Sequence, residues 1–113
     1  MIAADAPIRT PPTRTLRGVF EVEAVRFPTA ILVAVTGEID SSNADQFRTK
    51  IHSHGTTTPL HIDLAGVEFI DSHGLAVIVD EVRAGRDVQI VAASRVVRRL
   101  LDVLGLTHLL PLN

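Results

Sequence analysis

The alternation of hydrophobic and polar positions is clearest over residues 60–79, LHIDLAGVEFIDSHGLAVIV. Residues 60–64 alternate between apolar and polar types, which is the period of a strand with one face in the core. The alternation ends at residues 65–66, and apolar residues resume over 67–70. After Asp71 the apolar residues recur every three or four positions, so the pattern predicts a turn that leads directly into a helix.

This turn determines where Ser72 lies. An Asp or Ser ahead of an apolar run is typical of a helix start, because its side-chain oxygen accepts hydrogen bonds from the free N–H groups of the first turn. We therefore expect a helix from Ser72 to about Ala84, stopped by Gly85, with Ser72 on the surface beside the carboxylate of Asp71. Its core side is predicted to consist of Leu75, Ile78, Val79 and Val82. Its exposed side is predicted to include Ala76, Val77 and Asp80.

Two strands and a helix are expected before this segment. Residues 19–27 fit an edge strand, and the nearly continuous β-branched run at 30–36 is typical of a central strand covered on both faces. The short turn between them favours an antiparallel hairpin. Residues 40–43 offer several caps for a helix that should end near His54-Gly55. The inward face of this helix is expected to comprise Ala44, Phe47 and Ile51, with Arg48 as a further candidate.

The remaining chain continues the alternation of strands and helices. Residues 87–92 predict a strand, Ser94 a helix cap, and residues 106–112 a final short strand or a packed tail. The core stripe of the third helix, which Gly105 should end, is predicted to be Val97, Leu100, Leu101 and Leu104. The order strand, strand, helix, strand, helix, strand, helix predicts an α/β fold, with a mixed sheet whose later strands are joined by right-handed crossovers.

Length and composition limit the classes of function. A chain of 113 residues suits one domain, here residues 18–113, and the proline-containing stretch 1–17 is expected to form a flexible arm. A net charge of -2 and only four aromatic residues argue against a nucleic-acid surface. The absence of cysteine excludes disulfides and thiol chemistry. We expect no signal peptide and no membrane-spanning segment, hence a cytoplasmic location.

The string GVEFIDSHGLAVI resembles the signature of the STAS domain, specifically that of the anti-sigma factor antagonists. Members of that family carry an Asp-Ser-Ser/Thr-Gly-Leu turn after a hydrophobic strand, and His73 here stands in place of the second Ser/Thr. Residues 37–40, Gly-Glu-Ile-Asp, resemble the family's Gly-Glu-Leu-Asp, and residues 94–106 resemble its helix near the C-terminus. The three blocks occur in the expected order and cover about residues 18–112. The resemblance implies a STAS-like mixed sheet of four to five strands packed with three or more helices.

The resemblance also implies a role for Ser72. In the family, the first serine of the turn is phosphorylated by the partner anti-sigma factor, which is a serine kinase. The unmodified protein would bind that kinase and free a sigma factor, and a phosphatase would act on phosphorylated Ser72. Because the kinase brings the ATP, no cofactor is expected, and the protein would be a monomer or weak dimer. The implied contact surface comprises Asp40, Ser41, Ser42, Asp71, Ser72, His73, Gly74, Ala76, Val77 and Asp80.

Taken without the resemblance, the same residues have simpler interpretations. Ser72 could be a plain helix cap, and Asp40 and Asp71 a loop acid and a cap rather than paired catalytic carboxylates. Residues 71–73, Asp-Ser-His, do not make a catalytic triad, because adjacent side chains cannot generally aim at one another. His52 and His54 face apart on a helix, so we expect no metal site there. We expect no enzyme, and the rival function is an adaptor subunit of a membrane transporter or lipid-trafficking complex without a phosphorylation switch.

Overall fold

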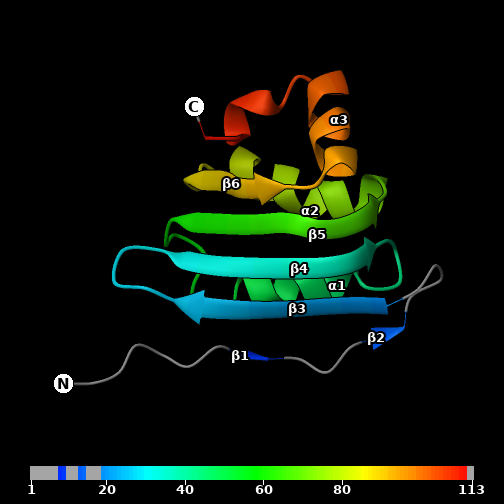
Figure 1. Cartoon of the computed structure of the whole chain (residues 1–113). Helices are drawn as coiled ribbons and strands as arrows, with labels where there is room; N and C mark the ends of the chain where they lie inside the picture. Colours follow the sequence, from blue (N-terminus) through cyan, green and yellow to red (C-terminus); the bar gives the residue numbers. More distant parts are fainter. Residues whose placement is uncertain (1–7, 10–12, 15–18, 112–113) are drawn as a thin grey trace.

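The computed structural model describes residues 8–9, 13–14 and 19–111, which form one mixed sheet with helices on both faces (Figure 1). The strands are β1 Ile8–Arg9, β2 Thr13–Arg14, β3 Val19–Arg26, β4 Ile31–Ile39, β5 Leu60–Ile70 and β6 Val88–Ala93. The helices are α1 Ala44–Ile51, α2 Ser72–Arg83 and α3 Arg95–Val103, and a 3₁₀ turn, η1, spans Thr107–Leu109.

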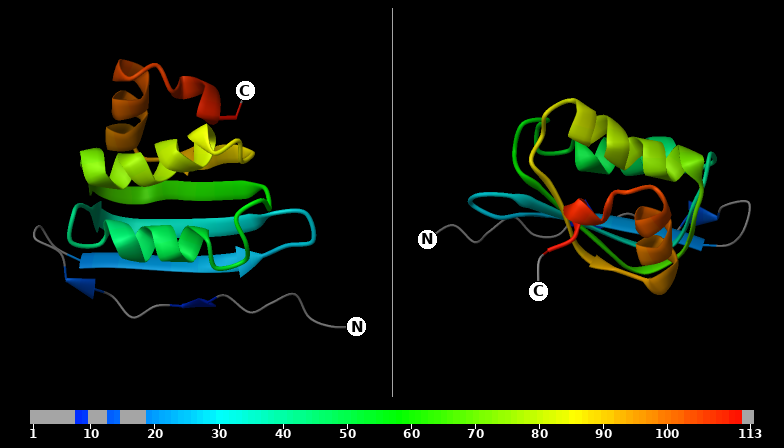
Figure 2. Two further views of the ribbon diagram at one scale, coloured as in Figure 1. Left: turned by 180° about the vertical axis from the view of Figure 1, so that it is seen from behind. Right: turned by 90° about the horizontal axis from the view of Figure 1, so that it is seen from above.

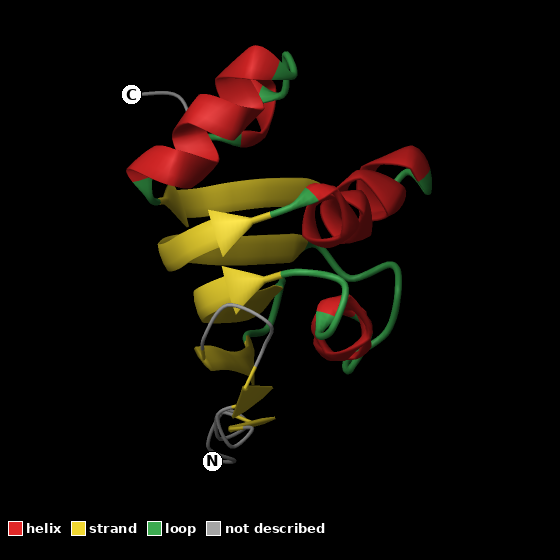
Figure 3. Ribbon diagram, turned by 90° about the vertical axis from the view of Figure 1, so that its right-hand side faces the viewer, coloured by secondary structure: helices red, strands yellow, loops and turns green. Residues whose placement is uncertain are grey.

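The sheet joins an antiparallel hairpin to a parallel half. Its strand order is β1-β3-β4-β5-β6, and β2 also pairs with β3. β3 and β4 are antiparallel, whereas β4, β5 and β6 are parallel to one another, so helices connect the parallel strands. α1 and α2 lie side by side on one face of the sheet, and α3 lies on the other face (Figures 2 and 3). The predicted α/β fold with a mixed sheet and three helices is confirmed.

The core lies mainly between the sheet and the pair α1 and α2. Alternate residues of the three long strands are buried here: Phe20, Val22 and Ala24 of β3, Ile31, Val33 and Val35 of β4, and Leu60, Ile62 and Leu64 of β5. Phe47 and Ile51 of α1 complete this layer, as their helical spacing predicted. A smaller layer on the other face holds Val97 and Leu101 of α3, which contacts β5 and β6.

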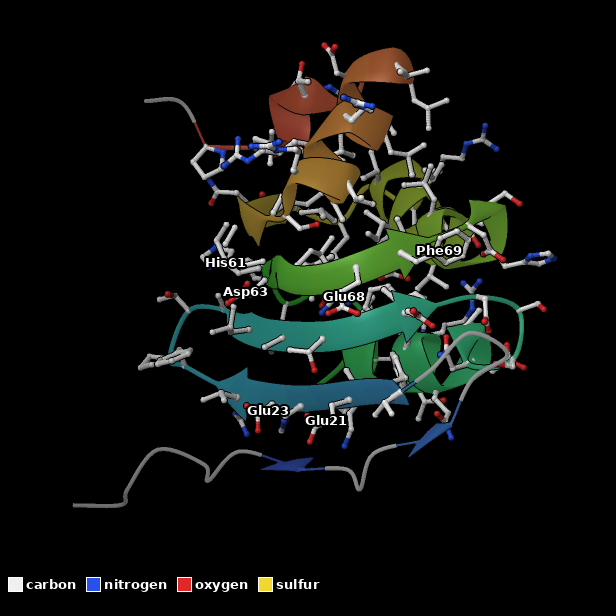
Figure 4. All side chains as sticks on the ribbon, turned by 45° about the vertical axis from the view of Figure 1, so that its right-hand side comes forward. Glu21, Glu23, His61, Asp63, Glu68 and Phe69 are labelled. Atoms are coloured by element: carbon white, nitrogen blue, oxygen red, sulfur yellow. The ribbon has the colours of Figure 1, made fainter. Side chains whose placement is uncertain are left out.

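β4 is covered on one face only, which corrects the expectation drawn from its β-branched run. Its residues alternate between buried and partly exposed positions, and Thr36 is exposed. Of the described helices, α3 packs on β5 and β6, so no described helix covers the part of this face formed by β3 and β4. Glu21 and Glu23 of β3, both half-buried, lie on this part of the face (Figure 4). A continuous apolar run shows that a strand is central, but tertiary packing decides whether both of its faces are covered.

β5 continues through the Ala-Gly pair that interrupts its hydrophobic alternation. Its pairing with β4 shifts between Asp63 and Gly66, where β5 contains one residue more than β4. A Cβ atom at Gly66 would lie 2.7 Å from Cγ2 of Thr36, so the glycine leaves room for the side chain of its register partner. The interruption is therefore a bulge inside one strand of 11 residues, not the end of a strand.

The ends of the helices differ from the predictions in two places. α1 ends at Ile51, ahead of the predicted stop at His54-Gly55, because the chain turns at His52 and Gly55 takes up a left-handed conformation with φ +98°. The C-terminal segment forms η1 with Leu109 buried, so of the two alternatives it is the packed tail. The predicted stops of α2 and α3 are confirmed by Gly85 and Gly105, which have φ +86° and φ +71°.

Two apolar helix residues lie on the side opposite to the one predicted. Val77 is fully buried, because the buried stripe of α2 runs through residues 74, 77, 78 and 81. Leu104 is 49% exposed, because it lies at the C-terminal end of α3, beyond the part of the helix that the sheet supports. The predicted flexible arm falls largely outside the described residues, and β1 and β2, the part that is described, pair with β3.

Candidate functional site

Two turns meet where β4 and β5 end. The two strands are parallel and their last residues, Ile39 and Ile70, are register partners. The backbone N–H of Asp71 donates to the carbonyl oxygen of Ile39 at 3.1 Å. The turn after β4, residues 40–43, therefore lies beside the turn after β5, residues 71–74. We call these two turns together the Ser72 edge.

In the second turn, Asp71 rather than Ser72 caps the helix. Oδ1 of Asp71 accepts hydrogen bonds from the backbone N–H groups of His73 at 2.9 Å and Gly74 at 3.1 Å. Ser72 is the first residue of α2 and is exposed, as predicted, and its hydroxyl makes no hydrogen bond to any residue that the structure describes. The interpretation of Ser72 as a plain cap is therefore wrong, and its hydroxyl is accessible at the N-terminus of the helix.

Gly74 brings the start of α2 close to the ends of both strands. A Cβ atom at this position would lie 2.6 Å from Cγ2 of Ile39 and 3.0 Å from Cγ1 of Ile70. Real Cβ atoms do not approach other atoms this closely, so a larger residue would displace α2 or the strands. Gly74 is buried and belongs to the packing of the Ser72 edge rather than to its surface.

In the first turn, the carboxylate of Asp40 is buried and accepts hydrogen bonds from within the turn. The residue is only 4% exposed, and its Oδ1 accepts hydrogen bonds from the backbone N–H and the hydroxyl of Ser42. Asn43, one of the predicted caps, is at the N-cap position of α1 but makes no side-chain cap hydrogen bond. Its side chain instead accepts from the backbone N–H of Asp40 at 3.0 Å and donates to the carbonyl oxygen of Glu38 at 2.8 Å. The interpretation of Asp40 as a loop acid is confirmed, because its buried carboxylate satisfies the turn.

The predicted contact surface contains fewer exposed residues than expected. The exposed members of the predicted set are Ser41, Ser42, Ser72, His73, Ala76 and Asp80. Asp71 is half-buried, and Asp40, Gly74 and Val77 are buried. Nδ1 of His73 lies 3.6 Å from Oδ2 of Asp71, and its side chain is largely exposed, as expected for a surface histidine.

α1 contributes Arg48, which was a candidate for the inward face of this helix and instead lies on its outer side, where 38% of its side chain is exposed. Nη1 of Arg48 lies 3.0 Å from Oδ2 of Asp80, and both side chains are partly exposed. The pair links the outer sides of α1 and α2, which lie next to each other (Figure 2). The two residues are 32 positions apart, so only the packing of the helices brings them together. The outer sides of α1 and α2 thus form one continuous surface.

A buried charged network holds the far ends of the same two helices together. Glu81 Oε1 lies 3.0 Å from Nη1 of Arg86, and its Oε2 lies 2.6 Å from Nε2 of His52. Arg86 also donates to the carbonyl oxygens of Ile51 at 3.0 Å and Thr58 at 2.6 Å. Glu81 follows Val77 by four residues and Ile78 by three. This helical spacing is the one signal in the sequence that Glu81 lies on the buried side of α2.

The network gives a structural explanation for His52. Its Nε2 lies 2.6 Å from a carboxylate oxygen of Glu81 in α2, and both His52 and His54 lie beyond Ile51, the last residue of α1. Within the described ranges, no group of three or more His, Cys, Asp or Glu residues is placed to hold a metal ion. Likewise, none of the described helices is both long and apolar enough to cross a membrane. A hollow of about 350 Å³ beside α1 contains no residue of the Ser72 edge.

Comparisons with known proteins agree with this fold. The family model described as "Mlab, STAS domain" matches residues 24–111. The anti-sigma-F factor antagonist RsfA of Mycobacterium tuberculosis (strain ATCC 25618 / H37Rv) is 28% identical over 92 residues, which cover 74% of this chain and 72% of that protein.

Two solved structures share the fold. The crystal structure of an anti-sigma factor antagonist from Mycobacterium paratuberculosis has a TM-score of 0.66 at 24% identity and covers 81% of this chain and 83% of its own. The anti-sigma factor antagonist SpoIIAA in its unphosphorylated form has a TM-score of 0.66 at 19% identity and covers 80% of this chain and 85% of its own. Since the family model spans most of the sequence and the sheet and helices agree, the chain belongs to the STAS domain family.

Proposed function

We propose that this protein is an anti-sigma factor antagonist. Unmodified, it binds a serine-kinase anti-sigma factor through the Ser72 edge and thereby releases a sigma factor. The kinase phosphorylates Ser72, and the phosphorylated protein no longer binds it tightly. The observation that carries the proposal is the exposed hydroxyl of Ser72, which Asp71 leaves unused by capping α2 in its place.

The geometry supports a modification that leaves the fold intact. Ser72 makes no side-chain hydrogen bond to the described residues, so a phosphate breaks no bond that the structure needs. Phosphorylation adds a charge of about -1.5 to -2. At the N-terminus of a helix this charge is stabilised by about 0.3–1 kcal/mol, and exposure to water keeps its repulsion from Asp71 small. We therefore expect the phosphorylated domain to stay folded.

The same charge weakens a complex because a partner excludes water. When the Ser72 edge is covered, the effective dielectric constant falls, and two like unit charges about 5 Å apart then repel by about 3 kcal/mol at a value of about 20. Asp71 lies next to Ser72 and is fixed by its two backbone hydrogen bonds, so it cannot move away. A loss of about 3 kcal/mol corresponds to an affinity about 100-fold lower.

The exposed surface defines where the partner is expected to bind. This surface comprises Ser72 and the exposed residues of both turns and of α2: Ser41, Ser42, His73, Ala76 and Asp80. Small residues dominate this surface, which lets a partner backbone approach Ser72 closely. Asp40 and Asn43 act indirectly, because their hydrogen bonds fix the turn that carries the two serines.

The proposal is tested by affinity capture from the native lysate with three baits. The baits are the wild-type protein, Ser72→Asp, and Thr57→Asp as a matched control. Thr57 is exposed ahead of β5, at the opposite end of the strand from Ser72, so it receives the same charge outside the proposed surface. We expect wild type and the control to retain a serine-kinase anti-sigma factor and Ser72→Asp to lose it.

Purified partner and ATP complete the test. We expect mass spectrometry to find one phosphate, at Ser72, and titration calorimetry to give an affinity about 100-fold lower for the phosphorylated form. Equal binding of Ser72→Asp and wild type would refute the switch. Recovery of transporter subunits by all three baits would instead establish the adaptor function.

A further inference from the structure

One face of the sheet is covered by a helix along β5 and β6 but not along β3 and β4. α3 packs on β5 and β6, and no described helix covers the other two strands on this face (Figure 3). β4 nevertheless contains a continuous apolar run at residues 31–35, which is typical of a strand covered on both faces. Leu32 and Ala34, which alternate with the buried residues of this run, are only half-buried. Within the described chain, one face of the central strand thus lacks a covering helix.

This part of the face has small residues in its middle and carboxylates on either side. The small residues are Ala34 and Thr36 of β4 and Gly66, the register partner of Thr36 in β5. The carboxylates belong to β3 and β5 and are seen on this face in Figure 4: Glu21, Glu23, Asp63 and Glu68. We call these small and acidic residues together the β3–β5 strip. Small residues allow a helix to approach the sheet closely, and carboxylates favour a helix that carries cations.

α3 has such a surface on the side that is turned away from its own sheet. Val97 and Leu101 are buried, and with about 3.6 residues per turn the opposite side of the helix is centred on Arg99. This outer side consists of exposed residues: Arg95, Val96, Arg99, Asp102 and Val103. Its two arginines lie about one turn apart and outnumber its one carboxylate. No described residue forms an ion pair with either arginine, so both charges are available to a second molecule.

We propose that two copies of the chain form a symmetric dimer in which α3 of each copy lies on the β3–β5 strip of the other. The arginines of α3 face the carboxylates of the strip, and its exposed valines pack over the face of β4 that its own chain leaves without a helix. Helix and strip belong to the same face of one sheet, so a two-fold axis between them forms both contacts at once. No residue of the Ser72 edge takes part, so the proposal does not depend on the kinase partner.

Sedimentation of the full-length chain, alone and in mixtures, tests the dimer. The helix variant is Arg95→Glu/Arg99→Glu, and the strip variant is Glu21→Arg/Glu68→Arg. Each variant alone brings like charges together at both contacts of its dimer, and we expect its association to be at least about tenfold weaker than that of wild type. In an equimolar mixture, the reversed helix meets the reversed strip and the unchanged helix meets the unchanged strip. We expect this mixture to form dimers as wild type does.

The matched control is Lys50→Glu/Arg83→Glu, which makes the same change of charge as the helix variant but on α1 and α2, the helices of the opposite face. We expect the control to dimerise like wild type and circular dichroism to show that every variant is folded. A wild-type chain that stays monomeric at every concentration would overturn the proposal. A control weakened as much as the helix variant, or a mixture that stays monomeric, would show that α3 and the strip do not form the contact.

Discussion

At the scale of single residues, the Ser72 edge depends on two neighbours that do not contact a partner themselves. Asp71 caps α2 and leaves the Ser72 hydroxyl accessible. Gly74 lets the first turn of the helix rest against the ends of β4 and β5. Replacing Asp71 removes the cap hydrogen bonds, whereas replacing Gly74 adds a Cβ atom where there is no room for one. The two roles can therefore be tested separately by substitution.

Asp71→Ala removes both cap hydrogen bonds and is expected to lower the free energy of unfolding by about 0.5–2 kcal/mol. Asp71→Ser supplies another good cap and is expected to retain most of the stability. Urea denaturation followed by circular dichroism measures the difference. If the alanine and serine variants were equally stable, Asp71 would not stabilise the helix by capping.

Gly74→Ala introduces the Cβ atom that would meet the side chains of Ile39 and Ile70. We expect a loss of about 1–3 kcal/mol, the usual range for overpacking, even though alanine favours helices more than glycine does. Ala76→Ser adds one heavy atom at an exposed position of the same helix and is expected to change stability by less than about 0.5 kcal/mol. A Gly74→Ala protein as stable as wild type would contradict the close packing.

At the scale of elements, the pair α1 and α2 is joined at the surface by Arg48 and Asp80, and internally by the network of Glu81 with Arg86 and His52. The two links differ in strength because their exposure differs. A partly exposed ion pair contributes at most about 1 kcal/mol. A buried ion becomes costly when its partner is removed, since it then lacks both water and a counter-charge.

Arg86→Met leaves Glu81 buried without its cation and is expected to lower the free energy of unfolding by about 3–5 kcal/mol. Adding Glu81→Leu removes the stranded charge, so the double variant is expected to be more stable than Arg86→Met alone. Guanidinium denaturation of the two single variants and the double variant gives the coupling energy. Additive losses would show that Glu81 and Arg86 do not act as a pair.

At the scale of the whole molecule, the sheet separates two surfaces. One face is covered by α1 and α2. On the other face α3 covers β5 and β6, and no described helix covers β3 and β4 (Figures 3 and 4). α3 carries more apolar residues than it buries, because Val97 and Leu101 face the sheet whereas Val96 and Val103 are exposed. Hydrophobicity alone does not identify which of these residues stabilise the fold.

Leu101→Ala is expected to lower the free energy of unfolding by about 2–5 kcal/mol, because the residue is almost fully buried and a cavity would remain. Val103→Ala, in the same helix at 75% exposure, is expected to change it by less than about 0.5 kcal/mol. Thermal unfolding of the two variants checks the orientation of α3. Equal losses would mean that the helix packs with a different face.

The sequence by itself determined the order of elements from β3 to α3, the hairpin, the Ser94 cap of α3 and the exposure of Ser72. These features depend on local rules: the period of apolar residues, the side-chain oxygen that precedes a helix, and the glycines that follow one. For the same reason the turn motif could be located within the chain. The sequence also placed Asp40 in the adjacent turn, but it did not show that the side chain of Asp40 is buried there.

Only the tertiary structure decided which side of each element is covered. Val77 is buried because α2 is rotated toward Gly74 and Glu81, and one face of β4 is open because no described helix reaches it. The links of Arg48 with Asp80 and of Glu81 with His52 join positions 32 and 29 apart. Such contacts depend on how helices pack on a sheet, and a pattern read over a few neighbouring residues contains no information about that packing.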